Sequence, residues 1–503
     1  MSEATFERLV AHARETALLT SISGLVEWDE QTYLPRAGAD YRAEQSAYLA
    51  GLVHRRNTAP EVGDWLAELR DSPLAADPAS EAGCVIRQLS HRYERQTRLP
   101  AELVEAIART SSQAQHAWVA ARKADDFESF RPWLEKTLKL QREQAAAFGF
   151  ERSPYDALLE EYEPGETAES VGAVLSGLRE ELAPLVRQIV ESGVNAPSDL
   201  VCREFAVQQQ EAFGKAAAAA IGFDFEAGRL DVTAHPFCGA AGPRDVRLTT
   251  RYQANDFGDG FFSILHEAGH GMYEQGLQAD WFGLPPGEAI SLGIHESQSR
   301  MWENLVGRSR GFWTRFFPQL SEAFPAAMAG VDPDAWWFAV NEAKPSLIRT
   351  ESDEATYNLH IIVRFELERA MIEGDLEPAD LPAAWNEAYA NTVGVTPPSD
   401  ANGVLQDVHW SAGLFGYFPT YALGNLYAAQ FFDQAEADLG DLEPAFAEGE
   451  FATLLGWLRE RIHSVGQRLS AADLVQKVTG KPLSHEPLMR RLRAKFGPLY
   501  GFG

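Results

Sequence analysis

The stretch FSILHEAGHGMY, residues 262–273, places His266 and His270 four residues apart. In an α-helix the side chains of residues i and i+4 lie one above the other, so these two imidazoles can reach the same metal ion. Glu267 is one residue along from His266, where its carboxylate can take a proton from a water molecule without binding the metal itself. The spacing therefore predicts a helix that carries two zinc ligands, His266 and His270, and a general base, Glu267.

The residues around the two histidines indicate that this helix is buried and closely packed. Ile264, Leu265 and Met272 give it an apolar side. Gly269 and Gly271 each cost a helix about 1 kcal/mol relative to alanine, which makes sense where a second backbone or a ligand approaches closely. Buried histidines and a buried carboxylate need partners, and a metal ion supplies them.

A catalytic zinc site needs a third protein ligand and one open position. The best candidate is Glu296, in SLGIHESQSRMWENL (residues 291–305), because a helix returning after the turn at 283–287 can bring a carboxylate against the two histidines. Its neighbour His295 points about 100° away around a helix, so the two residues rarely bind one ion together. Glu274 and Glu288 are poorer alternatives. His295 is equally well explained as a hydrogen-bond partner of a ligand or as a core histidine.

Most of the chain shows the spacing typical of amphipathic helices. Apolar residues recur every three or four positions in Phe6–Leu19, Leu103–Ala121, Phe130–Phe148, Val171–Val190, Tyr357–Ile372 and Leu454–Val465. Leu230–Phe237 and Val246–Tyr252 instead alternate and are separated by glycine and proline, which predicts a β-hairpin immediately before the metal helix. We therefore expect a mainly α fold with one small β-sheet beside the metal helix.

The breaks between the helical segments are short. They fall at Ser72–Ala82, Gly193–Ser198, Gly374–Pro382 and Thr396–Gly403, and none is long or polar enough to link independent domains. We expect a single unit, residues 1–503. It would consist of an N-terminal helical part (roughly 1–225), a catalytic part with the hairpin and metal helices (roughly 226–430) and a C-terminal helical part (roughly 431–503).

The composition restricts the partners and the compartment. Acidic residues number 73 against 44 basic ones, a formal net charge of −29. This argues against nucleic acid and anionic membranes as partners, because both require a positive protein surface. The N-terminus lacks the apolar core of a secretory signal, and no apolar run approaches the roughly 18–20 residues that span a bilayer. Three widely spaced cysteines predict no disulfide framework. We expect a cytoplasmic protein.

The chain also resembles a known family along nearly its whole length. The motifs that carry the resemblance are EWDEQTYLP (27–35), HPF (235–237), DVRLT (245–249), HEAGH (266–270), HESQ (295–298), IRTESD (348–353) and GVLQDVHW (403–410). With these motifs the chain is similar to the thermostable carboxypeptidase Taq family of zinc metallocarboxypeptidases.

This resemblance implies a mostly helical fold with a deep cleft, related to that of angiotensin-converting enzyme and neurolysin. It implies removal of single amino acids, with broad specificity, from peptides that have a free C-terminal carboxylate, and commonly a homodimer. His266, His270 and Glu296 would hold one Zn²⁺ ion per chain, for which another divalent metal such as Co²⁺ can substitute. Glu267 would be the general base.

Two of the other motifs suggest substrate contacts. Arg349 in IRTESD is the leading candidate to bind the terminal carboxylate of the substrate, since a guanidinium offers two parallel donors. The alternative for Arg349 is an ion pair with Glu351 or Asp353. His235 belongs to the HPF segment on the predicted hairpin, where an exposed strand edge can bind an extended peptide. Phe237 in the same segment is at least as well explained by packing within the hairpin.

The last motif suggests how the transition state is stabilised. His409, together with Tyr421, is a candidate hydrogen-bond donor to the oxyanion of the tetrahedral intermediate. Tyr417 is the alternative tyrosine, and the aromatic stretch HWSAGLFGYFPTY (409–421) can equally be part of the core. Arg247 in DVRLT can contact the substrate or form a structural ion pair, and the sequence does not choose between these roles.

Three alternatives to a carboxypeptidase remain. With the same chemistry, the enzyme could be a zinc oligoendopeptidase that cuts within short peptides, or an aminopeptidase with an acidic pocket for the substrate amine. From a different class comes a non-enzymatic helical scaffold with a structural zinc. Structural sites usually have four protein ligands and favour cysteine, yet no cysteine lies in HEAGHGMY or HESQS. The favoured function is zinc-dependent hydrolysis of the C-terminal peptide bond.

Overall fold

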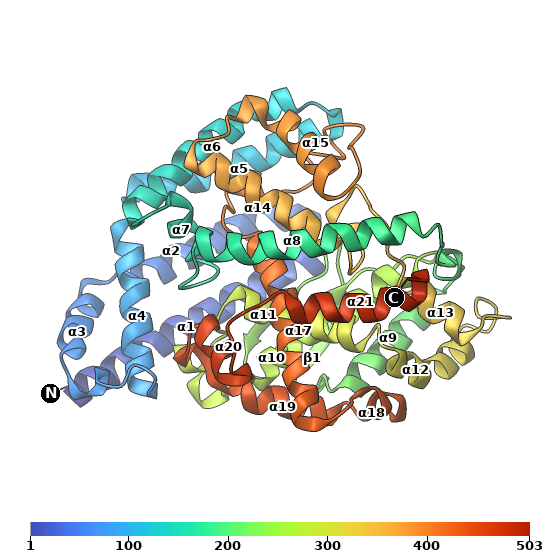
Figure 1. Cartoon of the computed structure of the whole chain (residues 1–503). Helices are drawn as coiled ribbons and strands as arrows, with labels where there is room; N and C mark the ends of the chain where they lie inside the picture. The colour runs from blue at the N-terminus through green and yellow to red at the C-terminus, as the bar shows by residue number, and fades with distance from the viewer. Residues whose placement is uncertain (1, 503) are drawn as a thin grey trace.

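The computed structural model describes residues 2–502, and helices form most of it (Figure 1). The predicted mainly α fold is confirmed. The helices that precede the sheet are α1 (Ser2–Thr32), α2 (Ala39–Asn57), α3 (Pro60–Arg70), α4 (Glu81–Arg98), α5 (Ala101–Ala124), α6 (Phe127–Phe148), α7 (Pro154–Leu159), α8 (Ala168–Glu191) and α9 (Val207–Ile221).

The helices after the sheet carry most of the predicted site residues. They are α10 (Phe257–Gly276), α11 (Leu292–Arg300), α12 (Arg310–Ala323), α13 (Pro333–Ala339), α14 (Tyr357–Glu373), α15 (Leu381–Thr392), α16 (His409–Ala412), α17 (Pro419–Leu439), α18 (Glu443–Glu448), α19 (Ala452–Arg461), α20 (Ala471–Thr479) and α21 (Glu486–Tyr500). A π-helix, η6 (Met301–Val306), continues α11, and a short 3₁₀ turn, η7 (Arg349–Glu351), precedes α14. Among residues 2–502, no helix combines the length and apolar character that a bilayer crossing needs.

The predicted helical segments lie within these helices, with one exception near the C-terminus. Leu454–Val465 extends beyond α19, which ends at Arg461. The chain then forms the 3₁₀ turns of η9 (His463–Arg468), which are interrupted at Gly466, where φ is 58°. A Cβ atom at Gly466 would come within 2.0 Å of the carbonyl oxygen of Pro286. The backbone of Gly466 therefore lies against that of Pro286, and the chain after α19 is not a continuous helix.

The sheet differs from the predicted hairpin. It has three strands, β1 (Gly228–Val232), β2 (Cys238–Gly242) and β3 (Asp245–Thr250), in the order β1-β3-β2. Strand β3 is parallel to β1 and antiparallel to β2. The prediction that Leu230–Phe237 and Val246–Tyr252 form a hairpin is therefore wrong. The hairpin consists of β2 and β3, and residues 233–237 connect β1 to β2.

The composition of β2 explains this difference. Its sequence, CGAAG, lacks the β-branched and aromatic residues by which strands are recognised. Small residues suit this strand because α1 lies against it, and Ser21 of α1 donates a hydrogen bond to the carbonyl oxygen of Ala241. The HPF segment lies in the connection before β2, where the backbone N–H of Phe237 donates to Thr249 Oγ1 over 2.8 Å.

Helix α10, which carries the HEAGH motif, lies in the middle of the fold and contacts β3, α9 and α11 (Figure 1). A Cβ atom at Gly269 would lie 2.6 Å from the carbonyl oxygen of Gln298 in α11. One at Gly271 would lie 2.6 Å from the ring of Phe223. The close approach of a second backbone, which these glycines predict, is confirmed at Gly269.

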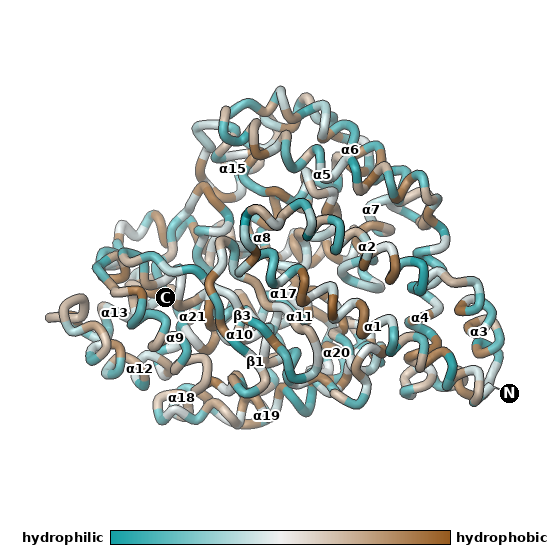
Figure 2. Tube along the Cα trace, turned by 180° about the vertical axis from the view of Figure 1, so that it is seen from behind, coloured by the Kyte–Doolittle hydropathy of each residue, from teal (hydrophilic) through white to brown (hydrophobic). Residues whose placement is uncertain are grey.

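The apolar core has two parts. The larger part extends from α5 to α21. The smaller part joins α1, α3 and α4 near the N-terminus (Figure 2) and consists of Leu9, Val62, Leu66, Leu69 and Ile86.

A cavity of about 530 Å³ is lined by residues of α1, α4, β2 and the last turn of α10. The N-terminal helices therefore cover one flank of the metal helix. The predicted division near residues 225 and 430 stays a prediction.

Candidate metal centre and substrate site

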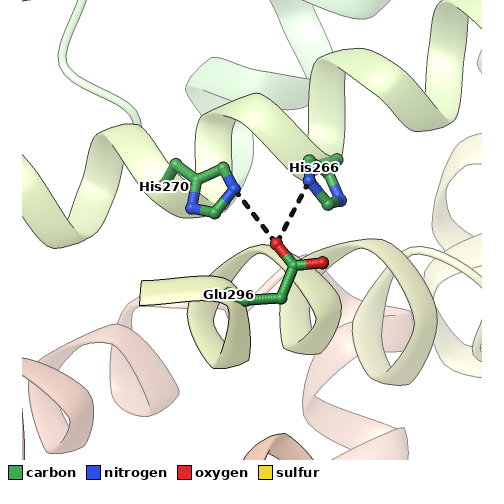
Figure 3. A group of neighbouring side chains, drawn as sticks. All are labelled: His266, His270 and Glu296. Carbon is green, nitrogen blue, oxygen red and sulfur yellow. Dashed lines mark ion pairs between the residues drawn. The ribbon is translucent and has the colours of Figure 1, made fainter. Parts of the chain in front are cut away.

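Helices α10 and α11 bring the three predicted metal ligands together (Figure 3). The Oε2 atom of Glu296 lies 3.6 Å from His266 Nε2 and 3.4 Å from His270 Nε2. Ligand atoms that surround one tetrahedral zinc ion at about 2.0–2.1 Å are roughly 3.3 Å from one another. The side chains present therefore fit a single metal ion of this size.

The position of Glu296 depends on close packing between helices. A Cβ atom at Gly424 of α17 would lie 2.4 Å from Glu296 Cγ, so only glycine allows α17 this close. Gly269 of α10 allows the same close approach from the side of the histidines. Helix α11 thus packs between α10 and α17, and each of these helices has a glycine at the point of contact. The glycine in each neighbour determines how near the carboxylate lies to the imidazoles.

Both oxygens of Glu296 accept hydrogen bonds from residues on the same helix. Arg300 Nε donates to Oε1 over 2.7 Å, and Ser299 Oγ donates to Oε2 over 3.0 Å. Burial alone would raise the pKa of Glu296, but the charges of Arg300 and His266 hold it well below its usual range. The carboxylate is therefore ionised, as a metal ligand has to be.

Each histidine ligand candidate uses its outer ring nitrogen for a protein contact. His266 Nδ1 lies 2.9 Å from Glu303 Oε2, on η6. His270 Nδ1 lies 3.1 Å from the carbonyl oxygen of His295. Such contacts orient a ligand ring and leave Nε2 free for the metal. Burial, together with the neighbouring His295, lowers the pKa of His270 to about 3, so its imidazole is neutral.

His295 lies on the outer side of His270 and away from the converging ligand atoms. The two rings stack with their centroids 4.5 Å apart, and the two Nδ1 atoms are 2.6 Å apart. His295 Nε2 bonds Glu274 Oε1 over 2.8 Å. Glu274 also lines the cavity beneath the N-terminal helices. Of the two roles left open by the sequence, the geometry matches a hydrogen-bond partner of a ligand candidate.

Glu267 lies beside the ligands, and its carboxyl group makes no hydrogen bond with any other residue in the range 2–502. Its side chain is buried, with 6% of the residue exposed. Burial raises the pKa of Glu267 to about 7, and the nearby charge of Glu296 acts in the same direction while His266 opposes it. A carboxyl group of this kind can take and return a proton near neutral pH.

The aromatic cluster of α16 and α17 joins this site. His409 Nε2 lies 3.2 Å from the hydroxyl of Tyr421, and the ring of Tyr417 lies 5.3 Å from that of Tyr421. Burial lowers the pKa of His409 to about 3, so this ring is neutral. Tyr421 is one turn before Gly424, the residue that contacts Glu296. Tyr421, which contacts both His409 and Tyr417, therefore lies on the helix that packs against Glu296.

Arg349 lies in η7 and is buried, with 6% of the residue exposed. Its Nε and Nη2 atoms donate to Asp407 Oδ1 over 3.0 and 2.8 Å, and Nη1 donates to Tyr357 Oη over 3.0 Å. The alternative pairing with Glu351 or Asp353 is therefore wrong. Asp353 instead accepts backbone N–H bonds at the start of α14.

Asp407 and Arg364 were not among the predicted site residues. Arg364 Nε donates to Asp407 Oδ2 over 2.6 Å, so one carboxylate bonds two guanidinium groups. Burial opposes ionisation, but Arg349 and Arg364 hold the pKa of Asp407 below its usual range. Because His409 is neutral, this cluster carries one unbalanced positive charge. Asp407 lies within the motif GVLQDVHW, which was the only sequence signal for it.

Two further residues lie near the sheet: His235, a predicted substrate contact, and Arg247, whose role the sequence left undecided. His235 is exposed in the connection between β1 and β2 and has no hydrogen bond with the rest of the described chain. Arg247 forms an ion pair with Asp245 through two bonds of 2.7 and 2.9 Å. Its guanidinium also lies 4.4 Å from the centre of the Trp28 ring. Arg247 therefore forms the structural ion pair.

Known proteins are similar to this chain along nearly its whole length. The family model described as carboxypeptidase Taq (M32) metallopeptidase matches residues 8–496. Thermostable carboxypeptidase 1 of Thermus thermophilus is 48% identical over 99% of this chain and 99% of its own length. Carboxypeptidase 1 of Bacillus subtilis is 36% identical over 95% of each chain. The crystal structure of an M32 carboxypeptidase from Deinococcus radiodurans R1 is 42% identical, with a TM-score of 0.96 over 99% of this chain and 100% of that one.

These matches decide between the functions that the sequence left open. They extend over nearly the whole of both chains, and the relatives are carboxypeptidases. They support the predicted carboxypeptidase over the oligoendopeptidase, the aminopeptidase and the non-enzymatic scaffold. The chain therefore belongs to the carboxypeptidase Taq (M32) metallopeptidase family and is a metallocarboxypeptidase, an enzyme that uses a divalent metal to hydrolyse peptide bonds.

Proposed function

We propose that this metallocarboxypeptidase uses one zinc ion per chain, held by His266 Nε2, His270 Nε2 and Glu296 Oε2. Two imidazoles and one carboxylate are a donor set typical of catalytic zinc. The main support for the proposal is that these three atoms converge: Glu296 Oε2 lies 3.6 Å from His266 Nε2 and 3.4 Å from His270 Nε2. The buried carboxyl group of Glu267 lies beside them and makes no hydrogen bond with another residue of the described chain. Co²⁺ accepts the same ligands and is expected to substitute.

Glu267 is the general base in this proposal. When bound, the metal supplies Lewis acidity that polarises the substrate carbonyl and favours loss of a proton from water. Glu267 accepts that proton, because its buried carboxyl group lies beside the ligands and has no hydrogen-bond partner among the described residues. It then donates the proton to the nitrogen of the leaving amino acid.

His409 and Tyr421 stabilise the negative charge that forms on the carbonyl oxygen. Burial raises the pKa of Tyr421 well above its usual value, so the phenol keeps its proton. The Tyr421 hydroxyl can accept a hydrogen bond from His409 Nε2, 3.2 Å away, and donate its own proton to the oxyanion. A neutral His409 suits this role because it needs no balancing charge in a buried site.

Arg349 binds the terminal carboxylate of the substrate. A guanidinium has five N–H donors, and the protein uses three of those on Arg349. Two donors and one unbalanced positive charge, shared with Arg364 around Asp407, are left for a carboxylate. A substrate whose C-terminus is amidated would leave that charge unbalanced.

His235 is proposed to contact the peptide on the other side of the scissile bond. It precedes β2, which is an edge strand because it pairs only with β3 in this sheet. An edge strand can bind an extended peptide by adding it as a further strand. The exposed imidazole of His235 would then lie next to the added segment.

A homodimer is the proposed assembly, and α2 is its proposed contact surface. No residue of α2 is buried, although the helix is 19 residues long. Tyr41 and Tyr48 lie two turns apart on one face, with exposed fractions of 68% and 67%. Exposed aromatic patches of this kind commonly mark protein interfaces. The experiment is sedimentation of the Tyr41→Asp/Tyr48→Asp double variant, which should be monomeric. A cytoplasmic location stays a prediction from the sequence.

The experiment that tests the proposed zinc site combines metal analysis with product analysis. The purified enzyme should contain one zinc ion per chain and should lose activity when a chelator removes it. Added Zn²⁺ or Co²⁺ should restore release of single C-terminal amino acids from an unblocked peptide. Activity that persists in the metal-free protein, or that returns only with Mg²⁺, would contradict the zinc assignment.

A further inference from the structure

A carboxylate can bind a metal ion through one oxygen or through both. The difference matters at a catalytic centre, because each additional protein oxygen occupies a position that water or the substrate carbonyl needs. In this protein the two oxygens of Glu296 have different surroundings. Oε2 faces both histidines, at 3.4 and 3.6 Å, whereas Oε1 is bonded to Arg300 at 2.7 Å.

Arg300 is held firmly in this position. Its side chain is 14% exposed, and its guanidinium lies 4.2 Å from the centre of the Tyr357 ring. Its Nη1 atom donates to Glu303 Oε2 over 3.2 Å. A planar guanidinium stacked on a ring and bonded at two edges has little freedom to leave Oε1.

The same arginine joins two parts of the candidate metal centre. Glu303 Oε2 accepts from Arg300 and also lies 2.9 Å from His266 Nδ1. Glu296 and Arg300 are four residues apart on α11, and Glu303 follows on η6, where it contacts the same histidine of α10 as Glu296 does. The widened π-turn of η6 begins directly after Arg300, at Met301. π-Turns of this kind are frequent at functional sites.

We propose that Arg300 is a positioning residue that restricts Glu296 to binding the metal through Oε2 alone. This keeps one coordination position open for water and the substrate carbonyl. The inference rests on the proposed role of Glu296 as a metal ligand. It goes further by assigning the binding mode of that ligand to a residue that does not touch the metal.

Arg308 provides a matched control. Its side chain is also largely buried, at 20% exposed, and its Nη2 atom lies 3.7 Å from Glu303 Oε1. Its guanidinium also stacks on a ring, 3.6 Å from the centre of Phe262. It makes no hydrogen bond with Glu296 within residues 2–502. Arg300→Gln and Arg308→Gln therefore both remove a buried arginine near Glu303. Only Arg300→Gln also removes the hydrogen bond to Glu296 Oε1.

The test uses the cobalt-substituted enzyme. The visible absorption of Co²⁺ is several-fold weaker with five or six ligands than with four. Arg300→Gln should release Oε1, let Glu296 bind through both oxygens, and weaken the absorption several-fold while cobalt remains bound. Arg308→Gln should keep the wild-type spectrum. X-ray absorption of the zinc-loaded wild-type enzyme should show a single carboxylate oxygen from Glu296, and this measurement needs no variant.

Each outcome has a defined meaning. A wild-type enzyme in which Glu296 binds zinc through both oxygens would overturn the inference, as would a cobalt-loaded Arg300→Gln protein with an unchanged spectrum. Glu296→Ala separates this failure from failure of the proposed function. If Glu296→Ala binds cobalt as tightly as the wild type, Glu296 is not a ligand at all. If Glu296→Ala loses cobalt but Arg300→Gln keeps the wild-type spectrum, only the role of Arg300 is wrong.

Discussion

His266 Nδ1 lies 2.9 Å from Glu303 Oε2, while the other ring nitrogen, Nε2, faces the carboxylate of Glu296. Glu303 therefore sets the orientation of a metal-binding ring from outside the ligand set. Arg300 holds Glu303 in turn. The burial of Glu303 would raise its pKa, but Arg300 and His266 lower it to about 2, so its charge is present at neutral pH.

We predict that Glu303→Ala weakens zinc binding by about 10- to 100-fold, the usual effect of removing the outer partner of a histidine ligand. Glu303→Gln should have a smaller effect because its amide oxygen can still accept from His266. Zinc affinity is measured by competition with a chelator of known affinity. Glu274→Gln is the control, since Glu274 bonds His295 instead of a proposed ligand. Unchanged zinc affinity in Glu303→Ala would contradict this role.

Glu267→Gln should retain zinc and lose most activity. The side chain is not a proposed ligand, so metal content should stay at the wild-type level. Its amide cannot accept a proton, so kcat should fall by about 10²- to 10⁴-fold. Metal analysis and peptide hydrolysis on the same sample check both parts. A zinc-loaded variant with near-wild-type turnover would rule out Glu267 as the base.

Glu296→Ala and His295→Ala should have opposite effects on metal retention. Removal of one of three protein ligands should release zinc during dialysis against a mild chelator and abolish activity. His295→Ala should keep most of its zinc, because the variant retains the backbone carbonyl oxygen of residue 295. In the wild-type structure this oxygen lies 3.1 Å from His270 Nδ1, which can still donate to it. The third ligand is misassigned if the Glu296 variant keeps zinc and the His295 variant loses it.

Two buried carboxyl groups should make the stability of the protein depend on pH. Burial raises the pKa of Glu163 and of Glu368 from an ordinary value of about 4.5 to about 8. Between these values the folded state keeps protons that the unfolded state has lost, so the free energy of unfolding falls as pH rises. The fall is at most about 1.4 kcal/mol per pH unit for each group.

The Glu163→Gln/Glu368→Gln double variant should therefore show a flatter pH profile than the wild type. The measurement is urea unfolding of the metal-free proteins at about pH 5.5, 7 and 8.5. Glu161→Gln, on the exposed surface of the same segment as Glu163, serves as the control and should follow the wild type. If the double variant and the wild type lose stability in parallel across this range, both carboxyl groups titrate as they do in the unfolded chain.

Much of the metal centre could be predicted because its spacing is local. His266, Glu267 and His270 lie within one helical turn and a half, and the approach of α11 to Gly269 follows from the cost of glycine in a helix. The choice of Glu296 needed only a returning helix. Helix geometry alone predicts that His295 points away from the ligand atoms, because adjacent residues point in different directions, and its ring contacts His270 Nδ1 and Glu274.

The remaining features depend on contacts between distant segments. Asp407 meets Arg349 and Arg364 across separations of 58 and 43 residues, and no periodicity in the sequence indicates that pairing. Glu163 contacts Gly293 at the start of α11 from 130 residues away. The sheet was wrongly predicted because β2 consists of small residues, which allow α1 to pack against it. Small residues have low strand propensity, so propensity rules do not identify β2 as a strand.

We predict that Arg349 makes this enzyme recognise a free C-terminal carboxylate, and a time course of peptide cleavage measures that recognition. Wild-type enzyme, Arg349→Ala and Arg349→Lys are each incubated with a free-acid peptide and with its C-terminally amidated twin, and products are identified by mass spectrometry. Lysine keeps the charge but cannot offer two parallel donors, so Arg349→Lys should recover only part of the activity.

The wild type should trim the free-acid peptide one residue at a time and leave the amidated peptide nearly intact. Arg349→Ala should lower kcat/KM for the free-acid peptide by roughly 30- to 700-fold, on the order of 2–4 kcal/mol of transition-state binding. Its zinc content should not change, and its preference for the free acid should collapse. Rapid cleavage of the amidated peptide by the wild type, or an unchanged preference in Arg349→Ala, would show that Arg349 does not recognise the terminal carboxylate.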